Sequence, residues 1–174
     1  GILIAVVGLL MLNMWWRRRQ DPAYGYFAAS ALVWAVQSTN LYVLDPPLDT
    51  AHWEILVNAS FQIFSALLLI SMLRSVRAEW KPLNLLLWSS LLASPLAMVL
   101  APPESFLRVT AALHMCTLIG SVGSLVLLFR SAWRDRNKDA RLLLATMGLI
   151  VLFAAHDWLL HSQQFSAIDE YSLN

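Results

Sequence analysis

The side chains in this sequence that could do chemistry are few, and they all fall in or at the ends of long apolar segments. They are three histidines, one carboxylate and two amides: His114, His156, Asp157, His161, Asn58 and Gln62. Polar groups in apolar segments are costly and usually face the interior of a helix bundle, where they mark ligand, ion or proton sites. Imidazole and carboxylate groups bind metal ions or exchange protons, and amides form hydrogen bonds. The set therefore predicts a ligand- or ion-sensing pocket.

Helical spacing refines this hypothesis. Asp157 and His161 are four residues apart and share one helix face, whereas His156 points about 100° away from Asp157. His114 and His156 lie roughly 12 Å and 10 Å below the outer ends of their predicted helices, at 1.5 Å per residue. These side chains are therefore expected at similar depths, near the outer side.

Three interpretations of the cluster remain open. It could be a packing network in which Asp157 pairs with a histidine, or a pocket for a ligand, a proton or a metal ion held by His114, Asp157 and His161. The third is a cofactor or catalytic site, either a haem between His114 and His156 or a metal-dependent hydrolase similar to alkaline ceramidases. No HExxH motif or cysteine pair identifies a metal, and no cofactor is expected.

The elements that must position these residues are transmembrane helices. The chain has 174 residues, 59% hydrophobic and only 13% charged, about half the charged fraction of a typical soluble domain. Six apolar segments have approximately the length of a membrane span: 1–16, 23–44, 53–73, 83–101, 106–129 and 142–160. They predict an all-α polytopic bundle. A net charge of +1 gives no basic field for nucleic acid, and the single Cys116 excludes a disulfide framework.

The basic residues predict the orientation. Eleven of the 12 lie in the connections after the first, third and fifth segments, and only Arg108 lies on the other side. Because basic loops stay in the cytoplasm, both ends of the chain are expected on the periplasmic side of a bacterial inner membrane. The chain starts with Gly1 within an apolar segment, so it is expected to be a fragment of a longer protein.

One stretch resembles a known family. Residues 17–28, with the sequence RRRQDPAYGYFA, run into the residues LVWA at 32–35. They resemble the first cytoplasmic loop and second helix of bacterial seven-transmembrane receptors with diverse intracellular signalling modules (7TMR-DISM). The His156-Asp157 step is also similar to the histidine-kinase members.

The resemblance implies a sensory region of a homodimeric receptor. A seventh helix is expected after residue 174, followed by a cytoplasmic output domain in the same chain. That output domain would be a histidine kinase or a diguanylate cyclase. No kinase or cyclase motif occurs in these 174 residues, so any enzymatic activity is expected elsewhere in the protein. The alternative function is a small membrane enzyme or cofactor-binding protein that uses the His/Asp cluster.

Two packing features are also predicted. Gly120, Ser121, Gly123 and Ser124 form a small-residue patch that would let a neighbouring helix approach closely. Pro95 removes a backbone donor within the fourth segment and is expected to bend that helix. The basic loop 130–141 is expected to contact anionic lipid headgroups or, alternatively, the output domain.

Overall fold

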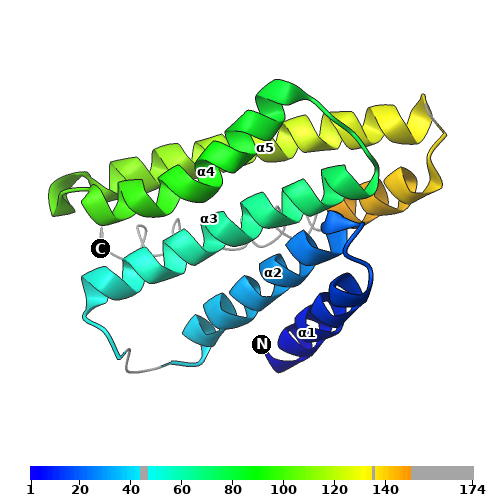
Figure 1. The fold of residues 1–174 in the computed structure, drawn as a ribbon. Coiled ribbons are helices and arrows are strands. Elements are labelled where there is room, and N and C mark those ends of the chain that lie inside the picture. Colours follow the sequence, from blue (N-terminus) through cyan, green and yellow to red (C-terminus); the bar gives the residue numbers. More distant parts are fainter. Residues whose placement is uncertain (44–46, 135, 150–174) are drawn as a thin grey trace, which may run out of the picture. The chain divides into compact units, whose positions relative to one another are not determined.

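The computed structural model describes residues 1–43, 47–134 and 136–149, and every regular element in that part of the chain is helical (Figure 1). The elements are α1 (Ile2–Arg17), α2 (Pro22–Gln37), α3 (Thr50–Ser75), α4 (Lys81–Leu100) and α5 (Phe106–Trp133), with 3-10 turns at Ser38–Leu41 and Pro103–Ser105. Residues 138–149 are also helical. The predicted all-α bundle is confirmed.

The lengths and surfaces of the helices are those of a membrane protein. Among the described residues, α3, α4 and the segment Pro103–Trp133 are each long and apolar enough to cross a bilayer, and α1 is a shorter apolar helix. Large apolar side chains point away from the bundle, for example Leu92, which is 74% exposed, and Leu107, which is 80% exposed. Such a surface is suited to lipid, because contiguous apolar patches are rare on soluble monomers.

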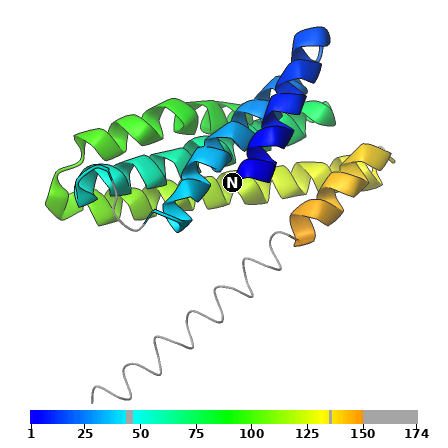
Figure 2. The same ribbon diagram turned by 90° about the horizontal axis from the view of Figure 1, so that it is seen from below.

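The chain divides into two compact units, Gly1–Leu127 and Leu128–Asn174. In the first unit, α1, α2, α3 and α4 lie side by side in chain order (Figures 1 and 2). Successive helices are antiparallel, so the connections 17–21 and 74–81 lie at one end, here named the basic end. The 3-10 turn Ser38–Leu41, the start of α3 and the end of α4 lie at the opposite end.

The small-residue patch on α5 packs as predicted. A Cβ atom placed on Gly120 would lie 3.1 Å from Leu87 Cδ2, and one on Gly123 would lie 3.2 Å from Leu83 Cδ1. The hydroxyls of Ser121 and Ser124 donate to carbonyl groups of α5 itself. The two glycines therefore allow α4 to approach α5 closely, and the two serines satisfy their own hydrogen-bonding needs.

Two tight connections fix the basic end. Asp21 accepts a hydrogen bond from the Ala23 amide at 3.1 Å and caps the start of α2. At the end of α3 the Ala78 amide donates to the Leu73 carbonyl at 2.9 Å, while Arg77 adopts a left-handed conformation with φ of 54°. This is the Schellman arrangement, which terminates a helix and satisfies its last carbonyls.

The predicted bounds of the second helix, 23–44, are wrong at the end. The α-helix ends at Gln37 and tightens into the 3-10 turn Ser38–Leu41. The hydroxyls of Ser38 and Thr39 donate to the carbonyls of Ala35 and Val36, and such local bonds compete with the helical ladder. By contrast, α3 starts three residues before its predicted start, and α5 ends four residues after its predicted end. An apolar count detects only the part of a helix that suits lipid, so it misses polar turns at helix ends.

The second unit contains the basic loop. Asn137 accepts hydrogen bonds from the amides of Asp139 and Ala140 and so caps the helix at 138–149. Arg141 Nε donates to the Ala132 carbonyl at 3.1 Å, and the rings of Phe129 and Trp133 stack with centroids 4.8 Å apart. The Arg141 hydrogen bond connects the first turn of this helix to the end of α5.

Candidate functional site

A partly buried hydrogen bond joins α3 to α5 near the middle of the first unit. The hydroxyl of Thr117 donates to Oε1 of Gln62, whose residue is only 1% exposed. Gln62 lies about 18 Å along α3 from Thr50, and Thr117 lies about 16 Å along α5 from Phe106, at 1.5 Å per residue. Both are therefore at mid-bilayer depth if the helices span a core about 30 Å thick.

The Thr117 hydroxyl has two acceptors within reach. Besides Gln62 Oε1, it lies 3.1 Å from the carbonyl oxygen of Leu113, one turn earlier in the same helix. A hydroxyl carries one proton, so it donates fully to only one of these acceptors at a time. The hydrogen bond between α3 and α5 therefore competes with a hydrogen bond within α5 for the same proton.

His114 lies one helical turn from Thr117, toward the opposite end. Its ring contacts Phe61 of α3, with ring centroids 5.4 Å apart and planes at 44°. The residue is partly buried. Of the predicted site residues, the structure thus brings Gln62 and His114 to one α3–α5 interface.

Asn58 has a different role. Its side-chain amide donates to the Glu54 carbonyl at 2.8 Å, so within the described part of the chain its recorded hydrogen bond stays inside α3. His156, Asp157 and His161 lie outside the described residues, and their place in the pocket stays a prediction. Within residues 1–43, 47–134 and 136–149, no group of three or more His, Cys, Asp or Glu side chains is arranged to hold a metal ion. The haem and hydrolase interpretations likewise stay untested.

A pocket of 270 Å³ opens between the 3-10 turn Ser38–Leu41 and the start of α3. Its lining includes Gln37, Asn40, Trp53 and Ser60. The indole Nε1 of Trp53 donates to Asn40 Oδ1 at 2.6 Å across this connection. The amides of Gln37 and Asn40 therefore line a separate pocket, nearer the opposite end than Gln62.

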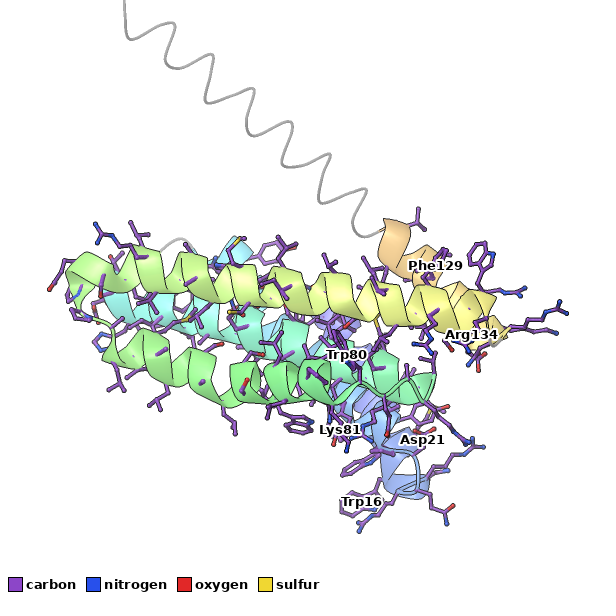
Figure 3. The ribbon with its side chains drawn as sticks, turned by 90° about the horizontal axis from the view of Figure 1, so that it is seen from above. Trp16, Asp21, Trp80, Lys81, Phe129 and Arg134 are labelled. Atoms are coloured by element: carbon purple, nitrogen blue, oxygen red, sulfur yellow. The ribbon has the colours of Figure 1, made fainter. Side chains whose placement is uncertain are left out.

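The basic end gathers interfacial side chains. Trp16, Asp21, Trp80 and Lys81 lie together at this end of the first unit (Figure 3). The Arg19 guanidinium lies 4.3 Å above the Trp16 ring, and Arg74 binds Glu79 at 3.5 Å. Tryptophan and basic residues of this kind favour the headgroup layer of a membrane.

An exposed ion pair lies at the start of α3, between Asp49, which precedes the helix, and His52 in its first turn. His52 Nδ1 is 2.5 Å from Asp49 Oδ1, and this hydrogen bond holds the pKa of Asp49 below its ordinary value of 3.8. A lowered carboxyl pKa favours folding above the ordinary value, and the contribution is lost as the pH falls through the lowered pKa. The effect on stability is small, because both side chains are largely in solvent.

We expect His52→Ala to raise the pKa of Asp49 toward 3.8, because the hydrogen bond from His52 is the largest cause of the shift. An NMR titration of the Asp49 carboxyl carbon would measure this directly. An unchanged Asp49 pKa in the variant would show that the pair does not form in solution.

Sequence reasoning missed Thr117, the partner of Gln62. The signal was available, because Thr117 is a hydroxyl residue in an apolar segment at nearly the same helical depth as Gln62. It was overlooked because threonines commonly bond within their own helix, and only the rotation of α5 against α3 shows the second acceptor.

Comparisons with known proteins agree with this architecture. The family model described as "7TM diverse intracellular signalling" matches residues 1–172, nearly the whole chain. Neither the search of curated proteins nor the search of solved structures found a match. From its helical membrane fold and this match, the chain belongs to the 7TM diverse intracellular signalling family, as a membrane sensory and signalling region.

Proposed function

We propose that this region senses a signal outside the cell and passes it to a cytoplasmic output domain in the same protein, most specifically a sensor histidine kinase of a two-component system. Membership of the signalling family supports a sensory role. The region would act in the lipid bilayer of the bacterial inner membrane, as a homodimer and without binding nucleic acid.

The proposed orientation places the basic end in the cytoplasm. Arginine or lysine residues cluster in the connections 17–21 and 74–81 and in the loop 130–141. Basic loops of this length are retained on the cytoplasmic side. The connection before α3 and the start of α5 then face the periplasm, as do both ends of the chain.

Cysteine labelling tests this orientation. In a Cys116→Ala background, a cysteine at Asp49 should react with a membrane-impermeant thiol reagent on intact spheroplasts. A cysteine at Glu79, whose side chain is 80% exposed at the basic end, should react only after lysis. The reverse pattern would overturn the orientation.

The observation that carries the sensing mechanism is the choice open to the Thr117 hydroxyl. When the Thr117 hydroxyl donates to Gln62 Oε1, a hydrogen bond joins α3 to α5. When it donates to the Leu113 carbonyl, the hydrogen bond lies within α5 and the one between the helices is absent. A ligand or a change of protonation near Phe61 and His114, one turn away, would favour one arrangement. A signal can shift such an equilibrium only through its different affinity for the two states.

A matched pair of variants tests this mechanism. Thr117 and Thr146 both lie within hydrogen-bonding distance of the carbonyl four residues earlier, but only Thr117 also binds Gln62. Thr117→Val should change the basal activity of the output domain by about fivefold or more, the effect of a coupling free energy near 1 kcal/mol. Thr146→Val should leave it unchanged. Equal activity of the two variants would contradict the mechanism.

A further inference from the structure

The side chains of α3, α4 and α5 meet in a layer at Gly120. A Cβ atom there would lie 3.1 Å from Leu87 Cδ2 of α4 and 3.9 Å from Leu69 Cδ1 of α3. This layer fixes the register of α3 against α4. The two helices are antiparallel. A residue a given number of positions before Leu69 in α3 therefore lies at the same depth as the residue the same number of positions after Leu87 in α4.

Gln62 and Ser94 are such a pair. Each lies seven residues from its layer residue, toward the end opposite the basic end. Seven residues make nearly two full helical turns, so Gln62 lies on the same face of α3 as Leu69, and Ser94 on the same face of α4 as Leu87. Their burial agrees, since Gln62 is 1% exposed and Ser94 is 0% exposed. The second layer between α3 and α4 is therefore polar.

Polar atoms in this layer lack partners. Gln62 Nε2 and Ser94 Oγ are buried and have no hydrogen-bond partner among the described residues. On α5, Thr110 Oγ1 is likewise buried and has no hydrogen-bond partner among the described residues. Thr110 lies seven residues from Thr117 and therefore on the same face of α5. An unpaired buried donor or acceptor costs about 1–3 kcal/mol, so such groups are normally satisfied by something.

Pro95 adds an acceptor beside Ser94. α4 is helical on both sides of Pro95, but proline has no N–H to donate to the carbonyl four residues earlier. That carbonyl belongs to Leu91, one turn before Ser94 and Pro95. The layer thus offers amide donors from Gln62, a hydroxyl from Ser94 and a carbonyl acceptor from Leu91, all without charge.

We propose that Gln62, Ser94 and the Leu91 carbonyl hold a buried water molecule between α3 and α4. Water both donates and accepts hydrogen bonds and typically makes about three of them when buried. The proposed water accepts a hydrogen bond from Gln62 Nε2 and donates one to the Leu91 carbonyl. Its third hydrogen bond is with the Ser94 hydroxyl, which can act as donor or acceptor. Uncharged groups do not favour a metal ion or an anion here.

This hydration site shares Gln62 with the proposed sensing mechanism, but it uses the other end of the amide. Oε1 accepts from Thr117, whereas Nε2 would donate to water. The site can therefore exist whether or not the Thr117 bond transmits a signal, and a direct observation of water separates the two ideas.

Water-edited solid-state NMR of the protein in lipid bilayers tests the proposal. The side-chain amide of Gln62 and the Cβ of Ser94 should receive magnetisation from water at short mixing times. Ser89, exposed on α4 with its hydroxyl bonded to the Leu86 carbonyl, should face lipid and receive little. The proposal would be overturned if magnetisation transfer from water to Gln62 and Ser94 were no greater than to Ser89. This result is also the one expected if another segment of the chain, and not water, binds the Gln62 amide.

Two prolines provide the matched variants. Pro95→Ala supplies an N–H to the Leu91 carbonyl, so it should reduce the water signal at Gln62 and Ser94. Pro82→Ala should not, because Pro82 lies in the first turn of α4, where its N–H would have no helical acceptor. An equal water signal in the two variants would also overturn the proposal. If Pro95→Ala does not fold, a second pair of variants gives the same test. Ser94→Ala should reduce the water signal at the Gln62 amide, and Ser89→Ala should leave it unchanged.

Discussion

Gly120→Leu should lower the free energy of unfolding by about 1–3 kcal/mol or more, as overpacking does in well-packed interiors. Even a single Cβ atom at this position would lie 3.1 Å from Leu87 Cδ2, and a leucine adds three further carbons beyond it. The helices α4 and α5 would have to move apart, which also removes the contact of Gly123 with Leu83. Unfolding in lipid bicelles, followed by steric trapping, would measure the loss.

Gly148→Leu is the matched control. A Cβ atom on Gly148 would have no atom of the described residues within 4 Å, and glycine is about 1 kcal/mol less favourable than alanine inside a helix. The control variant should therefore be as stable as the parent protein or slightly more stable. Equal destabilisation of the two variants would show that Gly120 does not lie at a close helix contact.

Thr117→Val should have the second large effect on stability. It removes the recorded partner of Gln62 Oε1 while Gln62 stays 1% exposed, and an orphaned buried acceptor costs about 1–3 kcal/mol. The double variant Gln62→Leu/Thr117→Val should recover most of this loss, because replacing both partners by apolar groups of similar shape is nearly neutral.

The same unfolding measurement gives the double-mutant cycle. Residues in direct contact show interaction energies of about 0.5–3 kcal/mol, so the two single losses should not add in the double variant. Additive losses would mean that Gln62 and Thr117 do not interact in the membrane.

The fold was largely predictable because membrane helices are marked by simple properties. Apolar length identified the helices, clustered arginines identified one end of the bundle, and small residues on α5 identified a close helix contact, whose partner the structure shows to be α4. Each of these signals depends on residue type and on spacing within one segment. The end of α2 was mispredicted because Ser38 and Thr39 bond to the preceding turn, which an apolar count does not detect.

The candidate site was predictable only in part. Residue type and apolar context selected Gln62 and His114, which the structure places at one interface between α3 and α5, whereas the depth argument paired His114 with His156, which lies outside the described residues. The partners Thr117 and Phe61 depend on how α5 is rotated against α3, and spacing within one segment carries no information about rotation between segments. For the same reason, Asn58 was grouped with Gln62 by depth although its recorded hydrogen bond is to its own helix.

The central claim is that the bond between Gln62 and Thr117 couples an external signal to the output domain. Its most direct test is the activity of the attached output domain in membranes that carry the double variant Gln62→Leu/Thr117→Val. The account predicts a folded protein close to the parent in stability, whose basal output differs by about fivefold or more, because the hydrogen bond between α3 and α5 no longer exists. A stable double variant with the output of the parent protein would contradict it.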